Sequence, residues 1–132
     1  MEFHWKIILT TIPISFLIMI YFIMQGLRTF DQIMKLVYQK SPETWEKLQQ
    51  PRGFFWKPES VKDLKGSYWA RVNLFSTMTW REYPEVNEIE GATDLLSKYK
   101  RIRVITNLVC FIFVVQLPIC FVLEAIVAWY KA

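Results

Sequence analysis

The chain has 132 residues, of which 53% are hydrophobic and 21% charged, and its formal net charge is +4. Between positions 28 and 103, 14 Lys and Arg residues stand against 10 Asp and Glu residues, so no uncompensated basic face indicates nucleic-acid binding. This length suits one structural unit. Because apolar residues gather at both ends of the chain and charges gather between them, the composition favours a membrane protein over a soluble domain.

Two uninterrupted apolar runs predict membrane-spanning helices. The first run contains no charged side chain, and the second contains only Glu124. Each is long enough, since about twenty helical residues cross a hydrocarbon core of roughly 30 Å. The first run is too long for a signal peptide and lacks a small-residue cleavage site, so we expect it to be retained. The predicted order is outer tail, span, central segment, span and outer tail, at residues 1–6, 7–27, 28–103, 104–128 and 129–132.

Basic residues near the ends of the two runs predict the orientation in the membrane. Seven Lys and Arg residues flank the central segment, whereas the outer tails offer only Lys6 and Lys131. The positive-inside rule therefore places the central segment in the cytoplasm and both termini outside. The bilayer is the expected partner, with anionic lipid headgroups bound by the basic residues nearest the second span. These residues are Lys98, Lys100, Arg101 and Arg103.

The first predicted helix continues beyond the membrane to about Lys40, because apolar residues recur there at helical spacing, with Asp31 on another face. Ser41 before Pro42 predicts the N-cap and the first position of a short helix. That helix should end near Gln49, before the break at residues 50–53.

An aromatic run, Phe54-Phe55-Trp56, follows this break. One interpretation is structural: the run packs into a small cytoplasmic core or lies at the lipid headgroups. The other is functional: the run is exposed and docks a protein partner.

A further helix is predicted from Ser60, its N-cap, to about Thr79. Its expected apolar face consists of Val61, Leu64, Tyr68, Val72 and Phe75. After a break at Tyr83-Pro84, the last helix should begin near Gly91 or Ala92 and enter the second span. We therefore expect an all-α membrane protein, a two-transmembrane helical hairpin with long cytoplasmic helical extensions and short helices in the connecting segment.

The common catalytic and metal-binding motifs are missing from the sequence. The one histidine, His4, stands in a terminal tail with no partner at a meaningful spacing. Four glycines are too few for an obvious phosphate-binding loop. We therefore expect no enzymatic activity, no cofactor and no metal.

Polar residues inside the spans are costly in lipid and therefore informative. Ser15 lies thirteen residues before Arg28, and Gln116 thirteen residues after Arg103, so both should lie at the same depth. We predict that they touch, with Thr11 on the same helix face as Ser15. Glu124 lies near the outer interface, where it reaches water, or it lines an ion or proton pathway with Gln116 in an oligomer.

The chain resembles the universal stress protein B family of small bacterial inner-membrane proteins. The resemblance rests on the two terminal spans and several short motifs along most of the chain. These motifs are Leu27-Arg28, Pro42, Gly53-Phe54-Phe55, a helix around Trp69, Arg81-Glu82-Tyr83 and Lys100-Arg101-Ile102-Arg103. A longer central segment and the acidic stretch from Glu82 to Asp94 depart from the family pattern. The resemblance implies a stress-linked protein of the bacterial inner membrane, of unknown molecular activity, and it adds no catalytic residues.

These observations lead to two hypotheses of function. In the first, the protein is a non-catalytic adaptor or small accessory subunit that acts through its cytoplasmic segment, with Phe54, Phe55 and Trp56 contacting a protein partner. In the second, it is an oligomeric ion or proton channel, or a transporter-associated protein, that uses Gln116 and Glu124.

Overall fold

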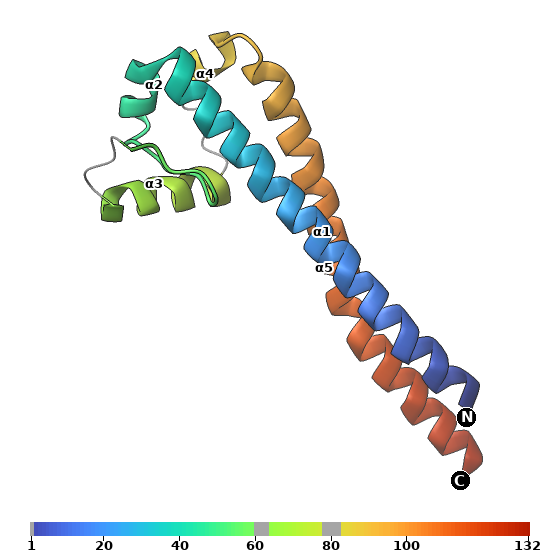
Figure 1. The fold of residues 1–132 in the computed structure, drawn as a ribbon. Coiled ribbons are helices and arrows are strands. Elements are labelled where there is room, and N and C mark those ends of the chain that lie inside the picture. The colour runs from blue at the N-terminus through green and yellow to red at the C-terminus, as the bar shows by residue number, and fades with distance from the viewer. Residues whose placement is uncertain (1, 60–63, 78–82) are drawn as a thin grey trace. The chain divides into compact units, whose positions relative to one another are not determined.

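The computed structural model describes residues 2–59, 64–77 and 83–132. Within these ranges the chain is α-helical and contains no strand, so the expected all-α class is confirmed. The helices are α1 (Glu2–Lys40), α2 (Pro42–Lys47), α3 (Leu64–Thr77), α4 (Glu85–Glu88) and α5 (Ala92–Lys131), as Figure 1 shows. The expected cap at Ser60 and the Arg81-Glu82 pair lie outside the described residues.

The chain divides into two compact units. The terminal unit comprises residues 1–24 and 103–132, and the central unit comprises residues 25–102.

In the terminal unit, the first part of α1 and the last part of α5 run side by side in opposite directions, with both chain ends at the same end of the pair (Figure 1). Phe16 and Phe113 pack across the pair with ring centroids 5.9 Å apart. Among the described residues, two helices are long and apolar enough to cross a membrane, and the most apolar 18-residue window of each contains no buried residue. This is the exposure expected of helices that face lipid, because a core helix of a soluble protein would be covered.

The central unit has a hydrophobic core to which every one of its described helices contributes. Phe30 of α1 lies at its centre, with Phe54, Phe75 and Tyr99 packed around its ring at centroid distances of 5.6, 5.6 and 6.2 Å. The buried core residues are Phe30, Ile33, Met34, Val37, Trp45, Leu48, Leu74, Val86, Ile89, Ala92, Leu96 and Tyr99. This core is local to residues 25–102, so the central unit has a tertiary structure of its own.

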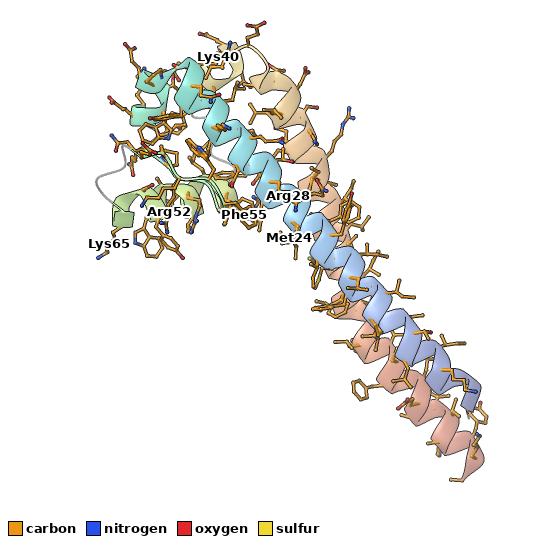
Figure 2. The ribbon with its side chains drawn as sticks, viewed as in Figure 1. Met24, Arg28, Lys40, Arg52, Phe55 and Lys65 are labelled. Atoms are coloured by element: carbon orange, nitrogen blue, oxygen red, sulfur yellow. The ribbon has the colours of Figure 1, made fainter. Side chains whose placement is uncertain are left out.

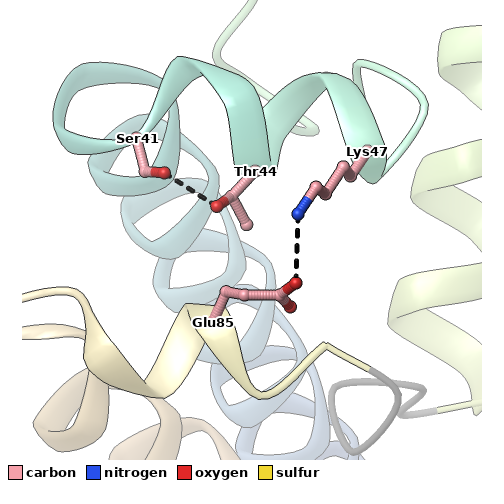
Figure 3. A network of polar contacts seen from close by, with 4 residues as sticks. All are labelled: Ser41, Thr44, Lys47 and Glu85. Carbon is pink, nitrogen blue, oxygen red and sulfur yellow. Dashed lines mark hydrogen bonds and ion pairs between the residues drawn. The ribbon is translucent and has the colours of Figure 1, made fainter.

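Helix α2 begins at Pro42 with Ser41 as its N-cap residue, as expected, but the Ser41 side chain makes no capping hydrogen bond. The Ser41 hydroxyl makes no hydrogen bond to the backbone of the first turn and instead lies 2.7 Å from the Thr44 hydroxyl (Figure 3). Proline at the first position already lacks an N–H, so one fewer donor needs a cap. The helix ends at Lys47, and positive φ angles at Gln49 and Gln50 turn the chain into the following loop.

An ion pair links α2 to α4 on the surface of the central unit. The ammonium group of Lys47 lies 3.2 Å from a carboxylate oxygen of Glu85 (Figure 3). The pKa of Glu85 is lowered first by a hydrogen bond from its own backbone N–H and then by Lys47. Exposed pairs of this kind contribute little to stability, and we assign the pair no function.

The face that α3 turns to the core agrees with the prediction at Phe75 but differs from it at Tyr68. Tyr68, expected on the apolar face, is exposed, whereas Ser67, Ala70, Arg71 and Leu74 are buried. Aromatic and aliphatic residues occur on several sides of this helix, so helical spacing alone could not select the buried side. Tertiary contacts set the buried side instead, because Leu74 is buried in the core around Phe30 and Phe75 packs against that core.

Candidate functional site

The loop between α2 and α3 folds around one buried carboxylate. The backbone N–H groups of Phe54, Phe55 and Trp56 donate hydrogen bonds of 2.6, 2.7 and 2.9 Å to the two carboxylate oxygens of Asp31. Consecutive N–H groups that converge in this way form an anion-binding concavity, and hydrogen bonds to an ionised acceptor are the stronger kind. Asp31 therefore holds this loop on α1.

The same contact corrects the sequence analysis, which put Asp31 on a face away from the apolar residues of the first helix. Its side chain is only 8% exposed. A buried acid would be unfavourable without partners, and the three N–H groups supply them. The sequence did contain one indication that Asp31 is buried. Asp31 lies three residues before Met34, so its side chain borders the helix face that Met34 occupies.

Gly53 allows the loop to approach Asp31 this closely. A Cβ atom at this position would lie 2.5–2.9 Å from three atoms of the Asp31 carboxylate group. The Gly53 N–H donates to the Trp56 carbonyl oxygen at 2.8 Å, which closes the turn. The Gly53 carbonyl oxygen accepts a hydrogen bond of 3.2 Å from Nη1 of Arg71.

This geometry divides the aromatic run between the core and the surface. Phe54 and Trp56 are partly buried and pack against the hydrophobic core, Phe54 against Phe75 and Trp56 against Tyr38. Phe55 between them is 63% exposed, and Figure 2 shows it on the loop that follows α2. The run is thus neither wholly a core plug nor wholly a surface patch.

Two arginines stack on the aromatic side chains beside the loop. The Arg71 guanidinium carbon lies 4.5 Å from the Phe54 ring centroid and 4.8 Å from that of Tyr68. The guanidinium carbon of Arg52 lies 5.9 Å from the same Tyr68 ring. Burial, and next the charge of Arg52, lower the pKa of Arg71. Neither arginine could be singled out from the sequence, because neither occurs in a recognisable motif.

In the terminal unit, the expected contact between Ser15 and Gln116 is present. The Ser15 hydroxyl donates to the Gln116 side-chain oxygen at 3.0 Å, and the Gln116 side-chain nitrogen donates to the Thr11 hydroxyl at 3.0 Å. Both the oxygen and the nitrogen of the Gln116 side-chain amide are therefore hydrogen-bonded within one chain. Glu124 is half-buried, farther along the same helix.

Replacing Gln116 with leucine should lower the stability of the terminal unit by about 1 kcal/mol or less, as for other hydrogen bonds between membrane helices. The loss is small because the Ser15 hydroxyl retains its bond to the Ile12 carbonyl oxygen. Reversible unfolding in bicelles would measure it. The matched control is Asn107→Leu, an exposed position on the same helix, which should not destabilise the unit. Equal effects of the two variants would contradict an energetic role for the Gln116 bonds.

The basic residues expected at the headgroups remain available on α5. Lys98, Lys100 and Arg101 are exposed, and Arg103 is half-buried. Among the described residues, no group of three or more His, Cys, Asp and Glu side chains is arranged to hold a metal ion.

The fold and these sites define the class of protein: an all-α chain with two helices that are long and apolar enough to cross a membrane, joined through a separately packed helical unit. No family model, curated protein or solved structure matches this chain.

Proposed function

We propose that the protein is a non-catalytic integral membrane protein that acts as an adaptor or small accessory subunit through its central unit. The two apolar helices support membrane insertion, because their apolar side chains are exposed and would be unfavourable in water. Location in the bacterial inner membrane, and a link to stress, are supported only by the resemblance to the universal stress protein B family.

In the proposed topology the central unit is cytoplasmic and both termini are periplasmic. The antiparallel arrangement within the terminal unit supports termini on one side of the membrane (Figure 1). The exposed Lys98, Lys100 and Arg101 support contact with anionic headgroups on the cytoplasmic side.

The exposure of Phe55 is the observation that carries the adaptor proposal. Its backbone N–H is bound to the buried Asp31 carboxylate, so the loop presents the ring from a fixed position. A loop whose backbone is held in this way needs little further ordering on binding. Large exposed aromatic residues of this kind are frequent binding hot spots.

Phe55→Ser should release a stoichiometric protein partner when the protein is purified in mild detergent and its co-purifying proteins are identified by mass spectrometry. The matched control is Trp69→Ser, since Trp69 is also an exposed aromatic residue, 55% accessible, but belongs to α3. This control should retain the partner. Loss of co-purifying protein from both variants would indicate general hydrophobic adhesion and contradict the proposal.

The channel or transporter-associated hypothesis is the second candidate. The side-chain oxygen and nitrogen of Gln116 already have hydrogen-bond partners within one chain, at Ser15 and Thr11. This alternative therefore depends mainly on Glu124. Purification of the wild type as a homo-oligomer without any other protein would favour it over the adaptor.

A further inference from the structure

The stacked arginines bring two positive charges against one aromatic ring. Arg52 precedes Gly53 in the loop, and Arg71 lies on α3, yet both guanidinium groups lie over Tyr68. Figure 2 shows Arg52 on the loop beside α3. Because like charges repel, two guanidinium groups in one place require compensation.

No described carboxylate supplies that compensation at ion-pair distance. The ion pairs found among the described residues join Lys40 to Glu90 and Lys47 to Glu85. Tyr68, and after it Asp31, raise the pKa of Arg71, but both oxygens of Asp31 already accept hydrogen bonds from backbone N–H groups. Within the part of the chain that the structure describes, neither arginine therefore has a carboxylate at ion-pair distance.

Both arginines, and Ser67 of α3, carry a buried polar atom that has no hydrogen-bond partner. Nε of Arg52, Nε of Arg71 and Oγ of Ser67 are buried and make no hydrogen bond. Arg71 is 9% exposed and Ser67 only 1%, and the two lie one turn apart on the same face of α3. Buried polar atoms in native proteins are nearly always satisfied, so a missing acceptor accounts for all three observations.

We propose that Arg52 and Arg71 form a binding site for a phosphate-type oxyanion, either a lipid phosphodiester or a soluble phosphate ester. Arginine is suited to this ligand because its planar guanidinium group donates two parallel hydrogen bonds to phosphate oxygens. Stacking on Phe54 and Tyr68 holds the groups in place before the ligand arrives. The site does not depend on the protein partner proposed for Phe55.

The test is titration of the purified full-length protein with inorganic phosphate, in a neutral detergent that contains no phosphate group. A parallel arm adds phosphatidylglycerol to the same detergent. The readout is the chemical shift of the arginine Nε–H resonances by nuclear magnetic resonance, because those hydrogens become bonded to the ligand. A response to inorganic phosphate identifies a soluble ligand, and a response only to phosphatidylglycerol identifies a lipid. Either response supports the site.

Arg52→Lys preserves the charge but removes the planar donor pair, so the apparent dissociation constant should rise at least about tenfold. Arg71→Lys should weaken binding similarly, but it also removes the bond to Gly53, so Arg52→Lys is the decisive variant. The matched control is Arg28→Lys, an exposed arginine of α1, which should bind as the wild type does. No response in either arm, or equal weakening by Arg52→Lys and Arg28→Lys, would overturn the proposal.

Discussion

Replacing Asp31 with alanine is expected to lower the free energy of unfolding of the central unit by about 3 kcal/mol or more. The variant leaves three backbone N–H groups without their charged acceptor. Hydrogen bonds to charged groups contribute about 1.5–3 kcal/mol each. The total effect should be less than their sum, because a released loop can hydrogen-bond to water. Urea denaturation in mild detergent would measure the change.

Hydrogen exchange provides a local test of the same prediction. The amides of Phe54, Phe55 and Trp56 should be protected in the wild type and should exchange much faster in the Asp31→Ala variant. The control is Asp94→Ala, which removes an exposed carboxylate from the first turn of α5 and should cost at most about 1 kcal/mol. If both variants had the same stability and amide protection, Asp31 would not be the group that holds the loop.

The Asp31→Asn variant separates charge from shape. Asparagine keeps one oxygen as an acceptor but directs an NH₂ group toward backbone donors. We therefore expect it to be destabilised nearly as much as the alanine variant, although its side chain has almost the same volume. Near wild-type stability would mean that the loop requires only one acceptor.

Alanine substitutions at two glycines of the central unit should have different effects: one should destabilise the unit and the other should not. Gly53→Ala should destabilise the unit by about 2 kcal/mol or more, because the new methyl group would collide with the Asp31 carboxylate. That carboxylate cannot move aside without breaking its bonds to the loop. Gly26→Ala, in the interior of α1, should be neutral or stabilising by up to about 1 kcal/mol. There the added Cβ meets only Cγ2 of Ile102, at an ordinary 3.6 Å. Thermal unfolding of the two variants beside the wild type would measure both.

A double variant tests whether Gly53 acts through Asp31. In the Asp31→Ala background the colliding atoms are absent, so Gly53→Ala should cost much less than it does alone. Contacting residues show such non-additivity, whereas distant ones add. Additive effects would mean that the glycine is required for another reason, such as the hydrogen bond of its N–H to Trp56.

Helix positions were largely predictable because they depend on local signals. The continuation of the first helix to Lys40, the start of α2 at Pro42 and the start of the last helix at Ala92 all agree with the prediction. Proline, glycine and helical spacing act within a few residues and can be read without knowing the fold. The single turn of α4 was not predicted, since four residues are too few to show a period.

The candidate sites were predictable to different degrees. The contact of Ser15 with Gln116 could be derived from matched depths, since two spans of similar length leave few possible pairings. The different environments of Phe54, Phe55 and Trp56 could not, because they depend on a loop conformation that the distant Asp31 stabilises. The arginine pair is likewise formed by residues nineteen positions apart, brought together by packing around Tyr68.

The sequence by itself determined the helical class, the two apolar helices and the charged central segment between them. Apolar run length, helical spacing and chain-breaking residues carry that information locally. Only the tertiary structure decided which side of α3 is buried, that Asp31 is buried and that Phe55 is exposed. Those outcomes depend on contacts between residues that are far apart in the chain. Burial of the Asp31 carboxylate, for example, becomes favourable only once three N–H groups of a distant loop surround it.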